Sequence, residues 1–502
     1  MLIWFVVVYL MASIGVGLYA ATRVHNTKDF AVAGRCLPLP VVMATVFATW
    51  FGAEAVFGVS ATFVQDGLRG VVADPFGASL CLVIAGIFYG TKLYKLNVLT
   101  LGDFFRMRYN RTVEVLTTLC IVASYLGWVS AQIKALGLVF SVVTDGALSE
   151  PVGMILGACI VLTYTVFGGM FAVAVLDFVQ MGVVMGGMLY ISYLVADLTG
   201  GAGVVVSHAA AAGKLDFFPD ADAAQWLAFL GAWITMMLGS VPQQDVFQRV
   251  TSAKSAKVAI LASLLGAGLY FCFTFIPMFI AYAATLIDPI VFNQLIAHDS
   301  QRVLPTLVLQ HTPVLAQAIF FGAVLSAIMS CSSATLLAPS VAFSENIIRG
   351  AFPELSDRAF LRIMRLTIVG FACIVLGFAL SSNVSIFKMV ENAYKITLAG
   401  AFVPLFFGAY WQRATTQGAL AAIFGGILSW LMVEFLLGEQ SLVPAQLIGL
   451  AISLCGMLAG SLLPQWFGVA ALDSGKTARH RLSAHRAAAQ THHAEPLHRH
   501  PE

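Results

Sequence analysis

Charged residues that interrupt long apolar stretches are the first candidates for chemistry in this 502-residue chain. They are Glu54, Asp74, Lys134, Asp245, Lys388, Glu391 and Lys395. A charge is expensive to bury in an apolar medium, so such residues usually mark an ion or solute pathway or neutralise one another. Carboxylates can hold cations or ammonium groups, and lysines can hold a solute carboxylate. The sequence therefore predicts a polar site inside an apolar protein.

Two of the apolar stretches contain residues that interrupt a helix. Residues 45–54 read TVFATWFGAE, with a glycine and a carboxylate in mid-stretch. Residues 239–245 read GSVPQQD, in which Pro242 removes a helix donor and polar residues follow. A break frees backbone carbonyls and helix ends, which can hold a dehydrated ion or a solute. We expect the polar residues at the two breaks to bind solute: Glu54, Gln243, Gln244 and Asp245.

Helical spacing suggests partners for some of these residues. Trp50 lies four residues before Glu54, so both side chains can share one helix face, and an aromatic face attracts ammonium groups. Asp74 is a plausible neutralising partner for Lys134 from another stretch. In the alternative, Lys134 binds a solute carboxylate, so a zwitterionic or anionic solute stays open.

A second spacing pattern surrounds Glu391. This residue lies three positions after Lys388 and four before Lys395. The spacing is typical of an ion-pair ladder along one helix face. If Glu391 is paired in this way, it is not free to bind solute.

Composition indicates the environment of these residues. Hydrophobic residues make up 59% of the chain and charged residues 10%, with a mean hydropathy of +0.88. A soluble domain carries about 25% charge, so this chain cannot cover a soluble surface of its size. Because lipid offers no hydrogen-bond partners, the stretches should cross the membrane as helices. The eight cysteines are scattered singly and indicate neither a zinc site nor a disulfide framework.

Thirteen spans are expected, and the basic loops set their orientation. Lysines and arginines outside the spans fall almost entirely on alternate loops, which should be cytoplasmic. The N-terminus is then outside and the C-terminus inside. The expected spans lie near residues 2–21, 38–64, 71–93, 113–142, 151–168, 174–198, 224–246, 258–286, 314–346, 362–382, 386–410, 416–437 and 444–466.

Several motifs, in order and at matching spans, resemble the sodium/solute symporter family of proline, sugar and choline transporters. They are residues 28–35, 167–170 leading to 177–180, 244–249 and 327–333. The resemblance covers roughly residues 1–470. It implies a ten-helix inverted-repeat core with broken helices that moves a solute inward together with sodium, by alternating access.

The resemblance also implies a sodium site. Sodium prefers oxygen ligands, as other hard cations do. The implied ligands are the carbonyls of Ala48, Phe51 and Ala327 and the Ser330 hydroxyl, together with the side chain at Cys331. A thiol is a soft ligand for a hard ion, so coupling to protons is an open alternative. Asp177 matches a family carboxylate that either assists ion exit, forms a second cation position, or only ends a helix.

For the solute, the resemblance points to the choline branch of the family. Trp50 and Trp128 match two positions of an aromatic cage, whereas the third tryptophan is Gln243 here and an expected tyrosine is Ala78. The cage is therefore half dismantled, which argues against choline and favours a hydrogen-bonding solute. Glu391 aligns with a polar solute position of the sugar-transporting relatives.

Together these features predict an all-α inner-membrane symporter for a small polar solute. The expected parts are 1–37 (extra helix and loop), 38–223 and 224–411 (inverted-repeat halves), 412–469 (two peripheral helices) and 470–502 (disordered cytoplasmic tail). Sodium is the expected coupling ion, and the expected partners are the solute and the bilayer, without cofactor, nucleic acid or obligate protein. The alternatives are a proton-coupled or uncoupled carrier and a membrane sensor. An enzyme is disfavoured, because no nucleophile–base or metal-ligand constellation stands out.

Overall fold

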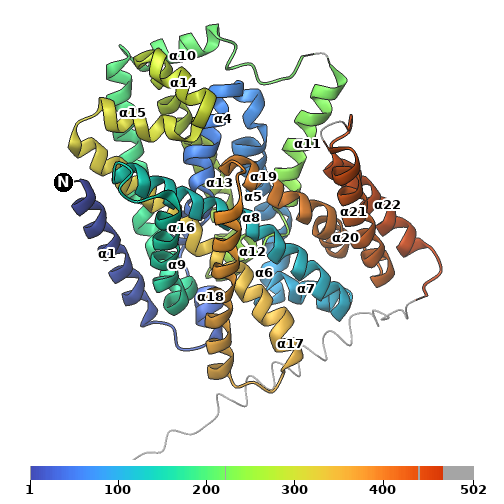
Figure 1. Cartoon of the computed structure of the whole chain (residues 1–502). Helices are drawn as coiled ribbons and strands as arrows, with labels where there is room; N and C mark the ends of the chain where they lie inside the picture. The colour runs from blue at the N-terminus through green and yellow to red at the C-terminus, as the bar shows by residue number, and fades with distance from the viewer. Residues whose placement is uncertain (1, 221, 439–440, 467–502) are drawn as a thin grey trace, which may run out of the picture.

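The computed structural model describes residues 2–220, 222–438 and 441–466 (Figure 1). Within these ranges the chain is helical apart from its connections and one isolated backbone bridge between Leu37 and Ala253. The all-α prediction is thereby confirmed. The expected tail, residues 470–502, lies outside the described residues.

Long apolar runs and short polar connections produce the helices of the first half. These are α1 (Leu2–Ala21), α2 (Thr27–Val32), α3 (Leu39–Trp50), α4 (Val59–Asp66), α5 (Ala78–Ile84), α6 (Gly90–Leu96), α7 (Leu101–Arg108), α8 (Arg111–Val143), α9 (Glu150–Leu198) and α10 (Ala202–Ala211). Short π or 3-10 turns join several of them, including η2 (Glu54–Gly58), η3 (Gly67–Val71), η4 (Val72–Gly77) and η5 (Ala85–Tyr89).

The second half continues in the same way. Its helices are α11 (Ala223–Gly239), α12 (Gln244–Ser252), α13 (Ala256–Ile287), α14 (Pro289–Asp299), α15 (Val303–His311), α16 (Val314–Phe343), α17 (Arg349–Ala351), α18 (Asp357–Ser381), α19 (Ile386–Thr397), α20 (Val403–Tyr410), α21 (Thr416–Leu436) and α22 (Ala445–Leu462). The π turns η7 (Ser344–Ile348) and η8 (Leu398–Phe402) extend α16 and join α19 to α20.

The helices that could span a membrane are fewer than the thirteen predicted. Among the described residues ten helices are long and apolar enough, or eleven when the bent pair α11–α12 counts as one span. The difference has a physical reason. The expected spans 151–168 and 174–198 are the two limbs of α9, which meet at the non-helical backbone of Gly169 and are counted as one helix. The run Glu54–Leu96 contains the expected span 71–93 and the end of 38–64, while α3 is too short to be counted by itself.

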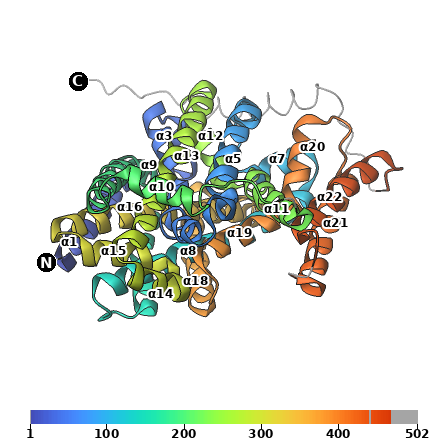
Figure 2. The same cartoon turned by 90° about the horizontal axis from the view of Figure 1, so that it is seen from above.

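The buried centre is built on α8 and α16, the most deeply buried long helices. Both pack against α9, and α3 contacts α9, α13 and α16. At opposite edges lie α1 and the pair α21–α22 (Figures 1 and 2). Short helices α10, α14 and α15 gather on one side (Figure 1). Polar residues that belong to the breaks are thus enclosed by apolar helices.

Gly169 is the residue that joins the two limbs of α9. Its backbone adopts φ +48°, and a Cβ added there would lie 2.5 Å from the carbonyl oxygen of Phe30. Side chains rarely adopt this backbone conformation, which costs about 1–3 kcal/mol. We therefore expect Gly169→Ala to lower the melting temperature of the purified protein. Gly182→Ala in the same helix is the matched control, since a Cβ added there meets no atom of the described residues within 4 Å. An equal loss of melting temperature in both variants would contradict the argument.

Candidate functional site

The first predicted break lies at the end of α3. Helical geometry stops at Phe51, which has φ −88° and ψ +72°, and resumes at η2. Gln132 of α8 bridges the gap, because its Oε1 accepts a hydrogen bond from the Ala53 N–H at 2.8 Å and its Nε2 donates to Glu54 at 2.5 Å. A Cβ on Gly52 would lie 2.7 Å from both Gln132 Oε1 and Cys331 Sγ. Glycine therefore lets α8 and α16 approach the open backbone.

The second break separates α11 from α12, which meet at an angle of 43°. Gln243 Nε2 donates to Ser124 Oγ on α8 at 2.9 Å, so this side chain faces the centre. Gln244 does not, because its Oε1 accepts from the Leu101 N–H at 2.9 Å at the start of α7. The structure thus separates Gln244 from the other predicted solute residues.

Five aromatic side chains from four helices, α3, α8, α13 and α19, meet between the two breaks. Trp50 lies 5.6 Å from Trp128 and 6.3 Å from Tyr394 between ring centroids, and its ring is parallel to that of Tyr394. Tyr270 lies 6.5 Å from Trp50, and Tyr125 stacks on Trp128 at 5.8 Å. All five are buried. We call this group the aromatic cluster; its rings are in direct contact, so a solute enters it only if they separate.

Three predicted carboxylates lie at the polar edges of these rings. Trp128 Nε1 donates to Glu54 at 2.9 Å, and the Tyr270 hydroxyl donates to Asp74 at 2.5 Å. The hydroxyl of Tyr125 donates to Asp245. The ring donors that bond these carboxylates are neutral. The carboxylates therefore remain available at the edge of the aromatic cluster to attract a positively charged group.

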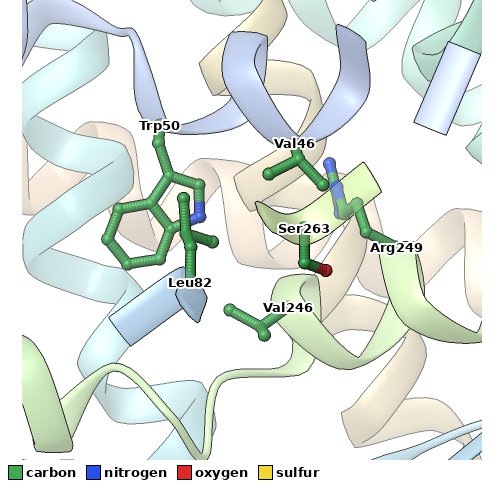
Figure 3. Close-up of a pocket in the computed structure, with 6 residues that line it drawn as sticks. All are labelled: Val46, Trp50, Leu82, Val246, Arg249 and Ser263. Carbon is green, nitrogen blue, oxygen red and sulfur yellow. The ribbon is translucent and has the colours of Figure 1, made fainter. Parts of the chain in front are cut away.

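The cation of this region is Arg249, a residue that the sequence pattern does not single out. It is only 3% exposed and donates to Thr49 Oγ1 at 2.6 Å and to the Asp245 carbonyl at 3.3 Å. Trp50 and Arg249 lie on opposite walls of a small cavity (Figure 3). Its volume of about 10 Å³ suits about one water molecule. One guanidinium thus stands against three carboxylates, so the region has more acidic than basic groups.

The predicted pairing of Lys134 with Asp74 is wrong. The Lys134 ammonium donates to the carbonyls of Val384 at 2.7 Å and Ser382 at 3.3 Å, between α18 and α19. Its side chain therefore points away from Asp74, which bonds Tyr270. The direction of the Lys134 side chain depends on how α8 is rotated about its own axis. The spacing of residues in the sequence does not reveal that rotation.

The predicted ladder around Glu391 is half correct. Lys388 pairs with Glu391 at 2.9 Å. Lys395 instead pairs with Glu434 of α21 at 3.6 Å. Glu391 is thereby engaged in an ion pair, and none of the three lysines named as candidates is directed to the aromatic cluster.

The predicted cation residues form two neighbouring groups: Ser330 with Asp177 in one, and Cys331 with the residues of the first break in the other. Ser330 on α16 donates a hydrogen bond to Asp177 on α9, whose second oxygen has no partner among the described residues. The Cys331 thiol lies 3.9 Å from Glu54 Oε1. Ala48 on α3, Phe51 directly after α3, and Ala327 on α16 are also buried, and these two helices pack against each other. A carboxylate with a free oxygen beside a hydroxyl suits a hard cation.

Gln132 and three of the cluster tyrosines were not predicted from the sequence. Gln132 lies four residues after Trp128, so the two share a helix face. A polar glutamine in an otherwise apolar stretch was the sequence signal that could have indicated its role. The tyrosines Tyr125, Tyr270 and Tyr394 carried no comparable signal, because aromatic residues are common throughout the spans.

Two helices broken at a buried polar centre define a class of protein, the helical membrane transporter. The sodium:solute symporter family model matches residues 30–426, and the chain belongs to this family. It is therefore a multi-pass plasma-membrane transporter and not an enzyme.

Individual relatives differ in solute. High affinity choline transporter 1 of Homo sapiens is 28% identical over 84% of this chain and 75% of its own length. The sodium/glucose cotransporter of Vibrio parahaemolyticus is 24% identical over 86% and 84%, respectively. For the osmoregulated proline transporter OpuE of Bacillus subtilis the values are 25%, 84% and 87%.

Solved structures show the same fold. A Na+-coupled sialic acid symporter in a substrate-bound outward-open state superposes with a TM-score of 0.79 at 19% identity, over 92% of this chain and 97% of its own. The nucleobase-cation-symport-1 transporter Mhp1 superposes with a TM-score of 0.57 at 15% identity, over 88% of this chain and 97% of its own. The all-helical arrangement is thus that of known cation-coupled transporters.

Proposed function

We propose that this protein imports a small organic cation together with sodium by alternating access, with Trp50 and the other rings of the aromatic cluster closing around the solute. One observation carries the choice of solute. Three buried carboxylates, Glu54, Asp74 and Asp245, each accept a hydrogen bond from the edge of a cluster ring. Such a bond increases the electron density of the ring, and an electron-rich face attracts a methylated ammonium group.

The balance of charge supports a cation over an anion. The lysines considered as anion ligands bind loop carbonyls or carboxylates elsewhere. Arg249 already donates to Thr49 and to a backbone carbonyl. A carboxylate solute would therefore meet mostly like charge, which is unfavourable in a buried site.

The aromatic cluster also changes the interpretation of the missing cage residues. Gln243 and Ala78 stand where the choline branch has aromatic side chains, yet Tyr394 and Tyr270 supply aromatic faces beside Trp50 from other helices. Several relatives are named as choline transporters, which supports a quaternary or methylated ammonium solute. Gln243 and Ser124, which bond each other, would supply hydrogen bonds to one polar group of the solute.

Sodium as coupling ion is supported by the family and by the pairing of Asp177 with Ser330. Proton coupling is the second candidate, and the thiol at Cys331 is the observation that favours it. The bilayer and the solute are the partners that this function requires. We further propose that the basic loops face the cytoplasm and that residues 38–223 and 224–411 form the two inverted halves.

Uptake into proteoliposomes tests this proposal directly. The solute panel should contain choline, betaine, an amino acid, a dicarboxylate and a sugar, each with an inward sodium gradient or a matched potassium gradient. We expect concentrative uptake of choline in sodium only, and weaker uptake of betaine, whose carboxylate would meet like charge. Uptake of the sugar or the dicarboxylate instead would refute the solute class, and uptake driven equally by a proton gradient in potassium would refute sodium coupling.

A further inference from the structure

A groove of about 370 Å³ lies outside the transport centre, between α1, the start of α3, and α9. Its depth comes from small residues, because Ala20 and Ala174 are both nearly completely buried. Its walls are apolar and include Val41, Phe171 and Val179. In Figure 2 α9 lies between α1 and α3, as the packing of these helices requires. The groove therefore follows the surfaces of three neighbouring helices.

The groove opens onto a surface that faces lipid. The walls Phe178 and Val179 are 46% and 52% exposed, and Trp4 and Met11 of α1 are 74% and 65% exposed. Apolar side chains with this exposure on membrane-spanning helices contact acyl chains. A folded protein partner or a polar peptide would find few hydrogen-bond groups along these walls, whereas an acyl chain needs none.

One end of the groove is basic. Arg23, an exposed residue just beyond α1, lines it. The backbone N–H of Lys254 donates to the carbonyl of Leu37 at 3.0 Å, so the backbone of a second basic residue adjoins the groove wall, and Arg23 is the basic side chain that lines it. Both residues belong to the basic loops that the charge distribution places at the cytoplasmic face. An apolar groove with a basic end matches the shape and charge of an anionic phospholipid.

We propose that this groove is a specific binding site for an anionic phospholipid of the inner leaflet, with one acyl chain along α9 and the phosphate at Arg23. Basic pockets between membrane helices on the cytoplasmic side hold anionic headgroups in this manner. A bound lipid would fill the space between α1 and α3, and α3 leads directly into the first break. The proposal does not depend on which solute is transported.

Lipid retention measured by native mass spectrometry tests the site. The full-length protein is purified in mild detergent and exposed to phosphatidylglycerol or phosphatidylcholine of equal chain length. We expect one tightly retained phosphatidylglycerol per chain and no retained phosphatidylcholine. Arg23→Ala should lower its affinity about fivefold, the factor that corresponds to about 1 kcal/mol for one basic contact. Arg23→Lys should restore most of the affinity.

Two further variants separate the groove from general lipid contact. Val179→Trp places a large side chain into the opening at an exposed position, and it should abolish retention without loss of folding. Arg413→Ala removes an exposed basic residue of a different loop, and retention should not change. Glycerol phosphate, which carries the headgroup charge without acyl chains, should not compete. Equal retention in the wild type, Arg23→Ala and Val179→Trp would overturn the proposal, as would loss of retention in Arg413→Ala.

Discussion

Glu54→Gln should reduce uptake of a quaternary ammonium solute at least about thirtyfold at limiting concentration. Removing one partner of a buried charge pair costs about 2–5 kcal/mol, and the lower value corresponds to this factor. The substitution keeps the size of the side chain and one acceptor for Trp128 Nε1. It loses the carboxylate oxygen that faces Gln132 Nε2, so the negative charge at the first break disappears with little change in shape.

The measurement is the initial rate of uptake into proteoliposomes over a range of solute concentrations. Because Gln132 Nε2 loses its acceptor, the melting temperature should fall, so uptake rates are compared per molecule of folded protein. Glu434→Gln is the matched control, since Glu434 pairs with Lys395 on an exposed part of α21. If Glu54→Gln transports the solute as the wild type does, the charge of the solute is not recognised at Glu54.

The sequence was most informative where it departed from a uniform apolar pattern. Gly52 with Glu54, and Pro242 with its polar followers, predicted two broken helices, and both breaks are present. The reason is local: glycine and proline change the backbone wherever they stand in a helix. Glu54, Asp74 and Asp245 were also found from the sequence, because a charge in an apolar stretch is rare.

Packing between helices was not predictable in the same way. A helix that is apolar on all sides has no polar stripe to mark its outer face, so its sequence does not show which side lies inward. Lys134 illustrates the error, since it was assigned to Asp74 and instead binds loop carbonyls near Val384. The tyrosines of the aromatic cluster were missed because aromatic residues are common throughout the spans and the sequence does not show which of them face one another. By contrast, the boundary expected between residues 168 and 174 coincides with the non-helical backbone of Gly169 in α9.

Sodium should raise the melting temperature of the detergent-purified protein relative to potassium at the same ionic strength, and Ser330→Ala should remove the difference. A ligand that binds only the folded state stabilises it by about 2.7 kcal/mol at a hundredfold excess over its Kd. Ser330 donates to Asp177, whose other oxygen has no partner among the described residues. A cation that takes the place of the hydroxyl proton would bind both oxygen groups.

Two variants on α16 make the sodium experiment specific. Ser340→Ala removes a buried hydroxyl that, among the described residues, bonds only the carbonyl of Leu336, so the sodium effect should persist. Cys331→Ser replaces a soft thiol by a harder oxygen ligand of similar size, and it should lower the sodium concentration needed for half of the effect. If Cys331→Ser has no influence while Ser330→Ala abolishes the effect, the ion is held by Asp177 and Ser330 without residue 331. If sodium and potassium stabilise all variants equally, the folded protein does not bind sodium in preference to potassium, and the proposal that sodium is the coupling ion fails.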